Sequence, residues 1–284
     1  MGRESEDAPI KPTALILALL WSTGAYAQGP GGANPAPRVT ASSVLFTVHI
    51  DEVGRESIGR FEGLNEAQAR ARNAVLSDNH LPAPPGYTLS TPEGKYFAFR
   101  GRASFGDLDK TPNYPDEVKE QFREKVDPYS DSIHPLLTFH HNEIWRLDTA
   151  SSYVPATADF AQMSFAMIHS EWVIPGMDDR YDSVVTLFRQ ALEKESAKQA
   201  CLVFYSSYGS GGQHFVWQAR NKDELADAHH PATILIGAYG EAEGNRIMSL
   251  WKSSLLRSED TEALARPEMN DLPAGTPWLG ILRK

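Results

Sequence analysis

Two short segments of the chain alternate between hydrophobic and polar residues, and they resemble each other. Residues 44–53 read Val-Leu-Phe-Thr-Val-His-Ile-Asp-Glu-Val, and residues 164–173 read Ser-Phe-Ala-Met-Ile-His-Ser-Glu-Trp-Val. Alternation with period two is typical of a β-strand with two different faces, so both segments are predicted to be strands. His49 aligns with His169, and each is followed two residues later by an acid, Asp51 or Glu171.

The pattern after each of these strands predicts the same order of elements. Apolar residues at helical spacing predict a helix at 64–77 in the first half and at 178–196 in the second. A hairpin is predicted after each helix, at 87–102 and at 201–220, because turns rich in Gly separate strand-like runs. The remaining predicted elements are helices at 115–125, 130–140, 223–228 and 243–257 and a strand at 143–147.

Three sets of matching residues place the two halves in register. The two histidines differ by 120 positions, residues 94–102 match residues 212–220 at an offset of 118, and residues 146–148 match 266–268 at 120. One short match arises easily by chance, but three in order at nearly constant spacing indicate an internal duplication.

Each half therefore reads strand, helix, strand, strand, helix and a further element, close to the split β-α-β arrangement of ferredoxin-like units. On this order the sequence resembles the dimeric α+β-barrel superfamily, which includes antibiotic-biosynthesis monooxygenases, EthD-like and NIPSNAP-like proteins and chlorite dismutases. The resemblance covers about residues 43–272 and carries no catalytic motif of a single member family. It implies an α+β fold in which two ferredoxin-like repeats, 43–155 and 162–272, face each other as an intrachain dimeric α+β barrel.

In a barrel of this kind one face of each strand lines the lumen and the other lies under helices. We assign the more apolar face of the first strand (Val44, Phe46, Val48, Ile50) to the helices, and His49 and Asp51 to the lumen. The same alternation assigns His169 and Glu171 to the lumen. In the hairpins it assigns Tyr96, Arg100, His214 and Gln218 to the lumen, and Phe97, Phe99, Phe215 and Trp217 to the core under the helices.

The predicted lumen thus has two candidate catalytic bases, His49 and His169. The candidate ligand contacts are Asp51, Glu171, Tyr96, Arg100, His214 and Gln218. An imidazole beside a carboxylate can abstract a proton from an activated carbon or polarise a carbonyl group. The same pair can also be a structural hydrogen bond, and duplication copies a structural pair as readily as a catalytic one.

Three functions are compatible with these residues. The first is a binding protein whose lumen holds a small aromatic or apolar molecule, and the second is a cofactor-independent monooxygenase-like or isomerase-like enzyme with a lumen histidine as base. The third is a structural or stress-related envelope protein whose barrel is occluded. A shared cavity at His49 and His169 would favour the first two, and a filled lumen the third.

Composition and motifs limit the classes of partner and cofactor that the protein could bind. The formal net charge of −10 argues against binding to nucleic acid or to anionic lipid, which would repel the chain. No HExxH or CxxC motif is present, so no metal is expected, and no cofactor is expected either. The chlorite dismutase resemblance suggests haem, but nothing in the sequence distinguishes one of the nine histidines as a proximal ligand. A homo-oligomer is compatible with the sequence.

The lone cysteine and the Gly-rich turn have simple explanations. Cys201 is the only cysteine, so no intramolecular disulfide can form, and its apolar surroundings predict a small buried side chain. Residues 209–212 read Gly-Ser-Gly-Gly and lack the Lys-Ser/Thr of a phosphate-binding loop, so they are predicted to be a hairpin turn.

The N-terminal region has the pattern of a secretory signal peptide. A short apolar run at 14–21 precedes an Ala-Tyr-Ala site at 25–27, although the leader before it carries acids as well as bases. We therefore predict a signal peptide at 1–27, a flexible lead-in at 28–42 and a C-terminal tail at 273–284. The mature protein is expected in the periplasm or outside the cell, without a membrane segment after cleavage; an uncleaved anchor is the alternative.

Export can be tested by mass spectrometry. When the full chain is expressed in a secreting host, the recovered protein should begin at Gln28, because a signal peptidase recognises the small residues at 25 and 27. Intact mass and N-terminal sequencing measure this directly. A recovered chain that retains residues 1–27 would contradict cleavage and support the anchor.

Overall fold

The computed structural model describes residues 45–83, 86–102, 104–108, 113–159, 162–226 and 230–270. These residues belong to one compact unit that spans Ala36–Lys284. The predicted signal peptide, lead-in and C-terminal tail lie outside the described residues, and so does Val44 of the first predicted strand. None of the described helices is long and apolar enough to span a bilayer.

The first repeat follows the predicted order of elements. Its elements are β1 (Leu45–Val53), α1 (Ile58–Asp78), β2 (Gly86–Ser90), β3 (Lys95–Arg102), α2 (Asp116–Lys125), α3 (Asp127–Ile133) and β4 (Leu137–Tyr153). The helix predicted at 130–140 is wrong at its end, since α3 stops at Ile133 and the chain is a strand from Leu137. This strand is also much longer than the predicted 143–147 because it pairs with two neighbours, β1 and β6.

The second repeat has the same order with one further helix. Its elements are β5 (Phe165–Val173), α4 (Asp178–Lys194), β6 (Ala200–Tyr208), β7 (Gln213–Ala219), α5 (Lys222–Ala226), α6 (Pro231–Tyr239), α7 (Glu241–Ser254) and β8 (Leu255–Ala265). β8 was not predicted, because charged residues such as Arg257 and Glu259 interrupt its apolar alternation. Tertiary pairing with β5 and β2 fixes it as a strand instead. The helix predicted at 243–257 is wrong at its end, since α7 stops at Ser254 and the chain is a strand from Leu255.

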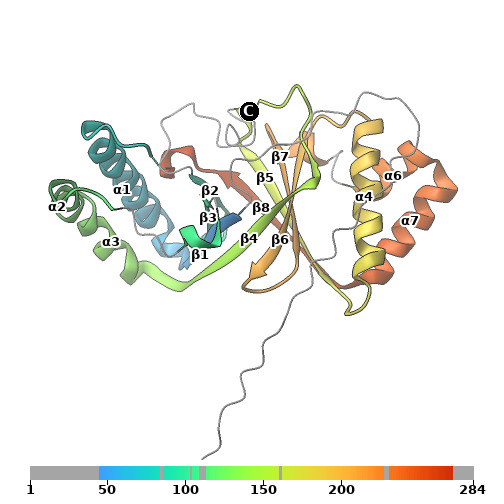
Figure 1. Cartoon of the computed structure of the whole chain (residues 1–284), viewed down its shortest axis with the longest axis horizontal. Coiled ribbons are helices and arrows are strands. Elements are labelled where there is room, and N and C mark those ends of the chain that lie inside the picture. The colour runs from blue at the N-terminus through green and yellow to red at the C-terminus, as the bar shows by residue number, and fades with distance from the viewer. Residues whose placement is uncertain are drawn as a thin grey trace, which may run out of the picture. The chain divides into compact units, whose positions relative to one another are not determined.

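The strands form one closed antiparallel barrel in the order β1-β3-β2-β8-β5-β7-β6-β4. Within it, each repeat has the ferredoxin-like sheet order, β4-β1-β3-β2 and β8-β5-β7-β6. The two sheets are joined by pairing of β2 with β8 and of β4 with β6. The helices α1, α2 and α3 gather beside the first sheet, and α4, α6 and α7 beside the second (Figure 1). The predicted fold of two facing ferredoxin-like repeats is therefore confirmed.

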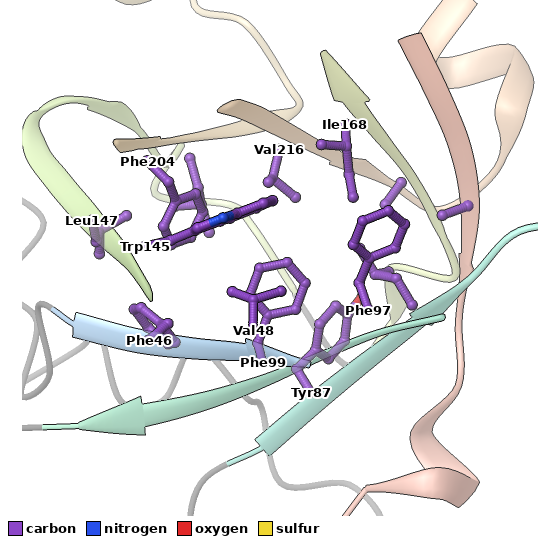
Figure 2. Packing of buried hydrophobic residues seen from close by; sticks show 14 of the residues in the cluster. Phe46, Val48, Tyr87, Phe97, Phe99, Trp145, Leu147, Ile168, Phe204 and Val216 are labelled. Carbon is purple, nitrogen blue, oxygen red and sulfur yellow. The ribbon is translucent and has the colours of Figure 1, made fainter. Parts of the chain in front are cut away.

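The lumen of the barrel is filled by side chains. A cluster of buried residues draws members from all eight strands: Phe46, Val48, Ile50, Tyr87, Leu89, Phe97, Phe99, Trp145, Leu147, Ala166, Ile168, Ala200, Leu202, Phe204, Val216 and Ala263. The rings of Phe99 and Trp145 meet edge to face with centroids 5.5 Å apart, and Phe204 packs beside both (Figure 2). An eight-stranded barrel has an interior just wide enough for side chains. The lumen is accordingly a hydrophobic core.

The predicted faces of the first strand of each repeat are wrong, and so are those of β3, since Phe97 and Phe99 lie in the lumen. The apolar side chains of Phe46, Val48 and Ile50 point into the lumen, whereas His49 and Asp51 lie on the helix side of the sheet. Alternation shows which residues share a face but not which face is inside. Both faces are covered here, and the face that is fully closed to water took the more apolar residues.

Packing of the lumen can be tested by truncating one ring. Phe99→Ala should lower the free energy of unfolding by about 3–5 kcal/mol, since it removes a buried ring and leaves a cavity. Phe139, which is 49% exposed, supplies the matched control, and Phe139→Ala should cost less than about 1 kcal/mol. Denaturant unfolding measures both. Equal costs for the two variants would contradict a filled lumen.

Candidate functional site

The residues predicted to share one lumen lie in three separate places. His49, Asp51, Tyr96 and Arg100 line a cleft between the first sheet and α1. His169 and Glu171 lie between the second sheet and its helices, where Met167 and Phe215 of the same face pack against α4 and α7. Val216 of the lumen cluster shares its face of β7 with His214 and Gln218.

The register of the paired strands explains why the predicted lumen residues lie in different places. His49 pairs with Ala98 across β1 and β3, whereas His169 pairs with Phe215 across β5 and β7. The hairpins therefore correspond at an offset of 117, one residue away from the offset of 118 that the sequence match suggested. A shift of one residue moves every side chain to the other face of a strand. Tyr96 and Arg100 are thus not the counterparts of His214 and Gln218.

His169 is held between two carboxylates. Its Nε2 lies 2.9 Å from Oε1 of Glu171, and its Nδ1 lies 2.5 Å from Oδ1 of Asp260. Asp260 stands directly opposite His169 in the pairing of β5 with β8, which fixes this geometry. Because both ring nitrogens face a carboxylate oxygen, both hydrogen bonds form when the ring is an imidazolium.

The two carboxylates have different surroundings. Glu171 has a side chain that is only 3% exposed, and its Oε2 accepts hydrogen bonds from the hydroxyl of Tyr181 on α4 and from Nε1 of Trp251 on α7, the latter at 2.9 Å. Asp260 is 61% exposed. Glu171 is therefore fixed in place by both helices, while Asp260 can meet a molecule from solvent.

Charge and burial act in opposite directions on His169. Burial disfavours the imidazolium, but the hydrogen bonds and charges of Glu171 and Asp260 outweigh it and raise the pKa of His169 above its ordinary value. A raised pKa stabilises the folded state below the ordinary histidine pKa, and this contribution is lost as the pH rises through the raised value.

A small aromatic pocket opens beside this histidine. Its volume is about 150 Å³, and its lining comprises Met167, His169, Phe188, Phe215, Trp217, His230, Pro231, Trp251 and Asp260. The rings of Phe188 and Trp251 meet edge to face with centroids 5.0 Å apart. Apolar cavities of this size hold a single benzene ring. The pocket thus offers room for one ring, with an ion pair in its wall.

The corresponding cleft of the first repeat is polar and larger, about 370 Å³. Its His–Asp pair joins Asp51 on β1 to His140 on β4, with 2.5 Å between Oδ1 of Asp51 and Nδ1 of His140. The acid and the imidazole have thus exchanged strands relative to His169 on β5 and Asp260 on β8. Burial and then the charge of Arg100 lower the pKa of His49 to about 4. His49 is therefore neutral at pH 7, and it disfavours the folded state as the pH falls from about 6.5 to about 4.

His214 and Gln218 are buried within the barrel. The His214 ring stacks on Trp145 at a centroid distance of 3.8 Å, and its Nδ1 shares a hydrogen bond with Ser170. Burial lowers the pKa of His214 to about 4. Beside them, Glu143 accepts hydrogen bonds from Nε1 of Trp145 at 2.7 Å and from the backbone N–H of Ser210 at 3.2 Å. These contacts tie the β6–β7 turn to the barrel.

The structure also bears on metals, haem and the cysteine. In the part of the chain that the structure describes, no group of three His, Cys, Asp or Glu side chains could hold a metal ion. A haem macrocycle does not fit the ring-sized pocket beside His169, whose two nitrogens are both bound to carboxylates.

Cys201 is buried, as predicted, and burial raises its pKa far above that of a reactive thiol.

Comparison with known proteins identifies the fold. No protein-family model matches the sequence, and no curated protein matches it significantly. Among solved structures, a candidate monooxygenase from Fusobacterium nucleatum aligns with 78% of this chain and 91% of its own, at 7% identity and a TM-score of 0.50. The chain has the dimeric α+β-barrel fold.

Two further structures align with this barrel at lower TM-scores. An anthrone oxidase-like protein matches 82% of this chain and 98% of its own, with 13% identity and a TM-score of 0.47. Chlorite dismutase from Candidatus Nitrospira defluvii, solved in complex with imidazole, matches 80% and 92%, with 8% identity and a TM-score of 0.45.

Three residues of the His169 site were not predicted. Asp260 was missed because its strand, β8, was not predicted, although the acid-rich run 258–262 could have been tested as an edge of the second sheet. Tyr181 and Trp251 lie on predicted helices. Their hydrogen bonds to Glu171 depend on helix placement, which periodicity does not give.

The role of Glu171 can be tested by titration. Glu171→Gln should lower the pKa of His169, because it removes a charge that favours the imidazolium. NMR titration of the imidazole Cε1–H signal measures this, with His169→Gln to assign the signal. Glu143→Gln is the matched control, since Glu143 is also buried and bound to a tryptophan but points into the barrel. A His169 pKa that is unchanged in Glu171→Gln would contradict the ion pair.

Proposed function

We propose that the protein is an enzyme that binds a small aromatic or apolar molecule in the pocket beside His169 and transfers a proton to or from it. The observation that carries this proposal is an imidazole placed between two carboxylates in the wall of an aromatic pocket. Titratable groups with shifted pKa values that line a mainly apolar pocket are typical of active sites.

Each residue has a distinct role in this proposal. Asp260, the exposed carboxylate, takes a proton from an activated C–H or O–H group of the substrate. The anion that remains on the substrate is stabilised by the imidazolium of His169, which lies in the same wall. Glu171 is a positioning residue: Tyr181 and Trp251 fix its carboxylate, and the carboxylate in turn orients the ring.

Two outcomes are open to the substrate carbanion. Return of the proton from Asp260 to a different atom completes an isomerisation and leaves the enzyme unchanged. Addition of dioxygen to the same carbon, followed by loss of water, converts a CH₂ group to a carbonyl and consumes one O₂. The candidate monooxygenase with the same fold favours the second reaction as an alternative. Both reactions begin with the same proton abstraction.

This site replaces the lumen as the place where a small molecule binds. The filled lumen leaves a structural role for the barrel interior, while the helix side of the second sheet keeps both a pocket and titratable groups. We also propose that the enzyme acts after export, on the basis of the N-terminal pattern alone.

Proton abstraction can be tested with a neutral single-ring probe, 1-phenylpropan-2-one, whose CH₂ group is acidified by a ring and a carbonyl. The protein should accelerate deuterium exchange at this carbon above the spontaneous rate in D₂O, as followed by NMR. Asp260→Asn and His169→Ala should each lower the protein-dependent rate by about 100-fold or more.

The matched control for this experiment is His140→Ala, which breaks the His–Asp pair of the first repeat and should leave exchange unchanged. Ring binding without acceleration, detected by line broadening of the probe, would make the protein a binding protein and contradict catalysis. Equal rates for the wild type and Asp260→Asn would exclude Asp260 as the base.

A further inference from the structure

The cleft of the first repeat occupies the same place in the fold as the His169 pocket but differs in shape and charge. In both repeats the space lies between the first strand, its hairpin neighbour and the helix that follows. Its volume is about 370 Å³ in the first repeat, against about 150 Å³ in the second. Because the backbone arrangement is the same in both repeats, side chains that differ between them must account for the difference in volume and charge.

Two exchanged side chains explain the difference. Ala98 pairs with His49 where Phe215 pairs with His169, so a methyl group replaces a ring. Arg100 pairs with Thr47 where Trp217 pairs with Met167, so a guanidinium replaces an indole. The first exchange opens the space and the second brings a positive charge to it.

A second cation faces the cleft from the helix. Arg72 of α1 and Arg100 of β3 both line it and are half-buried. Their electrostatic interactions are therefore stronger than those of fully solvated arginines. Both side chains also have interactions within the protein. Among the described lining residues the only carboxylate is Asp51, which is already paired with His140. The described lining therefore carries two guanidinium groups and one carboxylate, in a chain whose net charge is −10.

The remaining lining has an apolar part and neutral polar groups. Phe61, Ala69, Ile133, Leu137 and Met269 supply apolar surface, and the hydroxyls of Thr88 and Ser130 supply hydrogen-bonding groups. After burial, the charge of Arg100 is the next cause of the low pKa of His49, which also lines the cleft. Apolar surface beside cations matches a molecule with an apolar body and an anionic group.

We propose that this cleft is a second ligand site, which binds a small organic carboxylate with an apolar body and places its carboxylate between Arg72 and Arg100. A guanidinium binds a carboxylate through charge-assisted hydrogen bonds, which are stronger than neutral ones. The larger volume accepts a body of more than one ring. The site is independent of the reaction at His169.

Binding can be measured by isothermal titration calorimetry with 2-naphthoate as the probe and the neutral 2-naphthylmethanol as its uncharged counterpart. The wild type should bind one equivalent of 2-naphthoate and bind the alcohol more weakly. Arg100→Gln should weaken 2-naphthoate binding by about 10- to 100-fold, because it removes one charge-assisted contact. Arg100→Lys should restore part of the affinity.

Ala98→Phe tests the shape of the site without changing its charge. It installs the side chain that the second repeat has at this place, so it should abolish 2-naphthoate binding while the melting temperature shows that the variant is folded. His169→Ala should leave the affinity within about 2-fold, since additivity holds for separate sites. Arg100→Gln and Ala98→Phe should leave proton exchange at the His169 pocket unchanged.

The results that would overturn the second site are equally specific. They are no 2-naphthoate binding by the wild type, equal affinities for the acid and the alcohol, or an affinity unchanged in both Arg100→Gln and Ala98→Phe. Loss of 2-naphthoate binding in His169→Ala would mean that the probe occupies the His169 pocket instead. Each of these results leaves the exchange assay of the proposed enzyme to be judged separately.

Discussion

Closure of the barrel is the constraint on which the rest of the structure depends. Once β2 pairs with β8 and β4 with β6, each strand has one face inside a narrow closed space, which side chains fill in this protein. Aromatic residues such as Phe99 and Trp145 fill it, and a substrate cannot enter without displacing the core that holds the two sheets together. The pockets beside His169 and His49 accordingly lie on the outer face, between the sheet and the helices.

The histidine that is repeated at 49 and 169 shows how neighbouring side chains determine the pKa of an imidazole. The backbone holds His49 and His169 at the same place in each repeat. Burial and then the charge of Arg100 keep the first neutral, whereas Glu171 and Asp260 favour the charged form of the second. The direction of each pKa shift follows from burial together with the charged side chains on the same strand and on the neighbouring strands. Duplication thus supplied two similar positions, and substitutions around them produced opposite electrostatics.

Sequence patterns were sufficient for the order of most elements and for the facing of two repeats, because strand alternation and helical spacing are local properties. They did not show which face of β1 lies inside, since both faces are buried against something. The offset of 118 between the hairpins was one residue from the structural register, so His214 lies in the barrel as predicted but Tyr96 lies on the opposite face of its sheet, outside the lumen. Asp260 was missed because β8 is held by tertiary pairing against its local composition.

A second His–Glu pair, on β4, shows that the face of the sheet on which such a pair lies determines its role. His141 and Glu143 on β4 lie two residues apart with Nε2 and Oε1 3.0 Å apart, nearly the geometry of His169 and Glu171 on β5. Glu143 points into the barrel, where Trp145 and the backbone of Ser210 complete its hydrogen bonds, so the pair braces a turn. Glu171 faces the helices, and its histidine meets a second, exposed carboxylate at the edge of an aromatic pocket. The same two residue types thus serve stability on one face of the sheet and can serve chemistry on the other, because only the helix side combines burial with access.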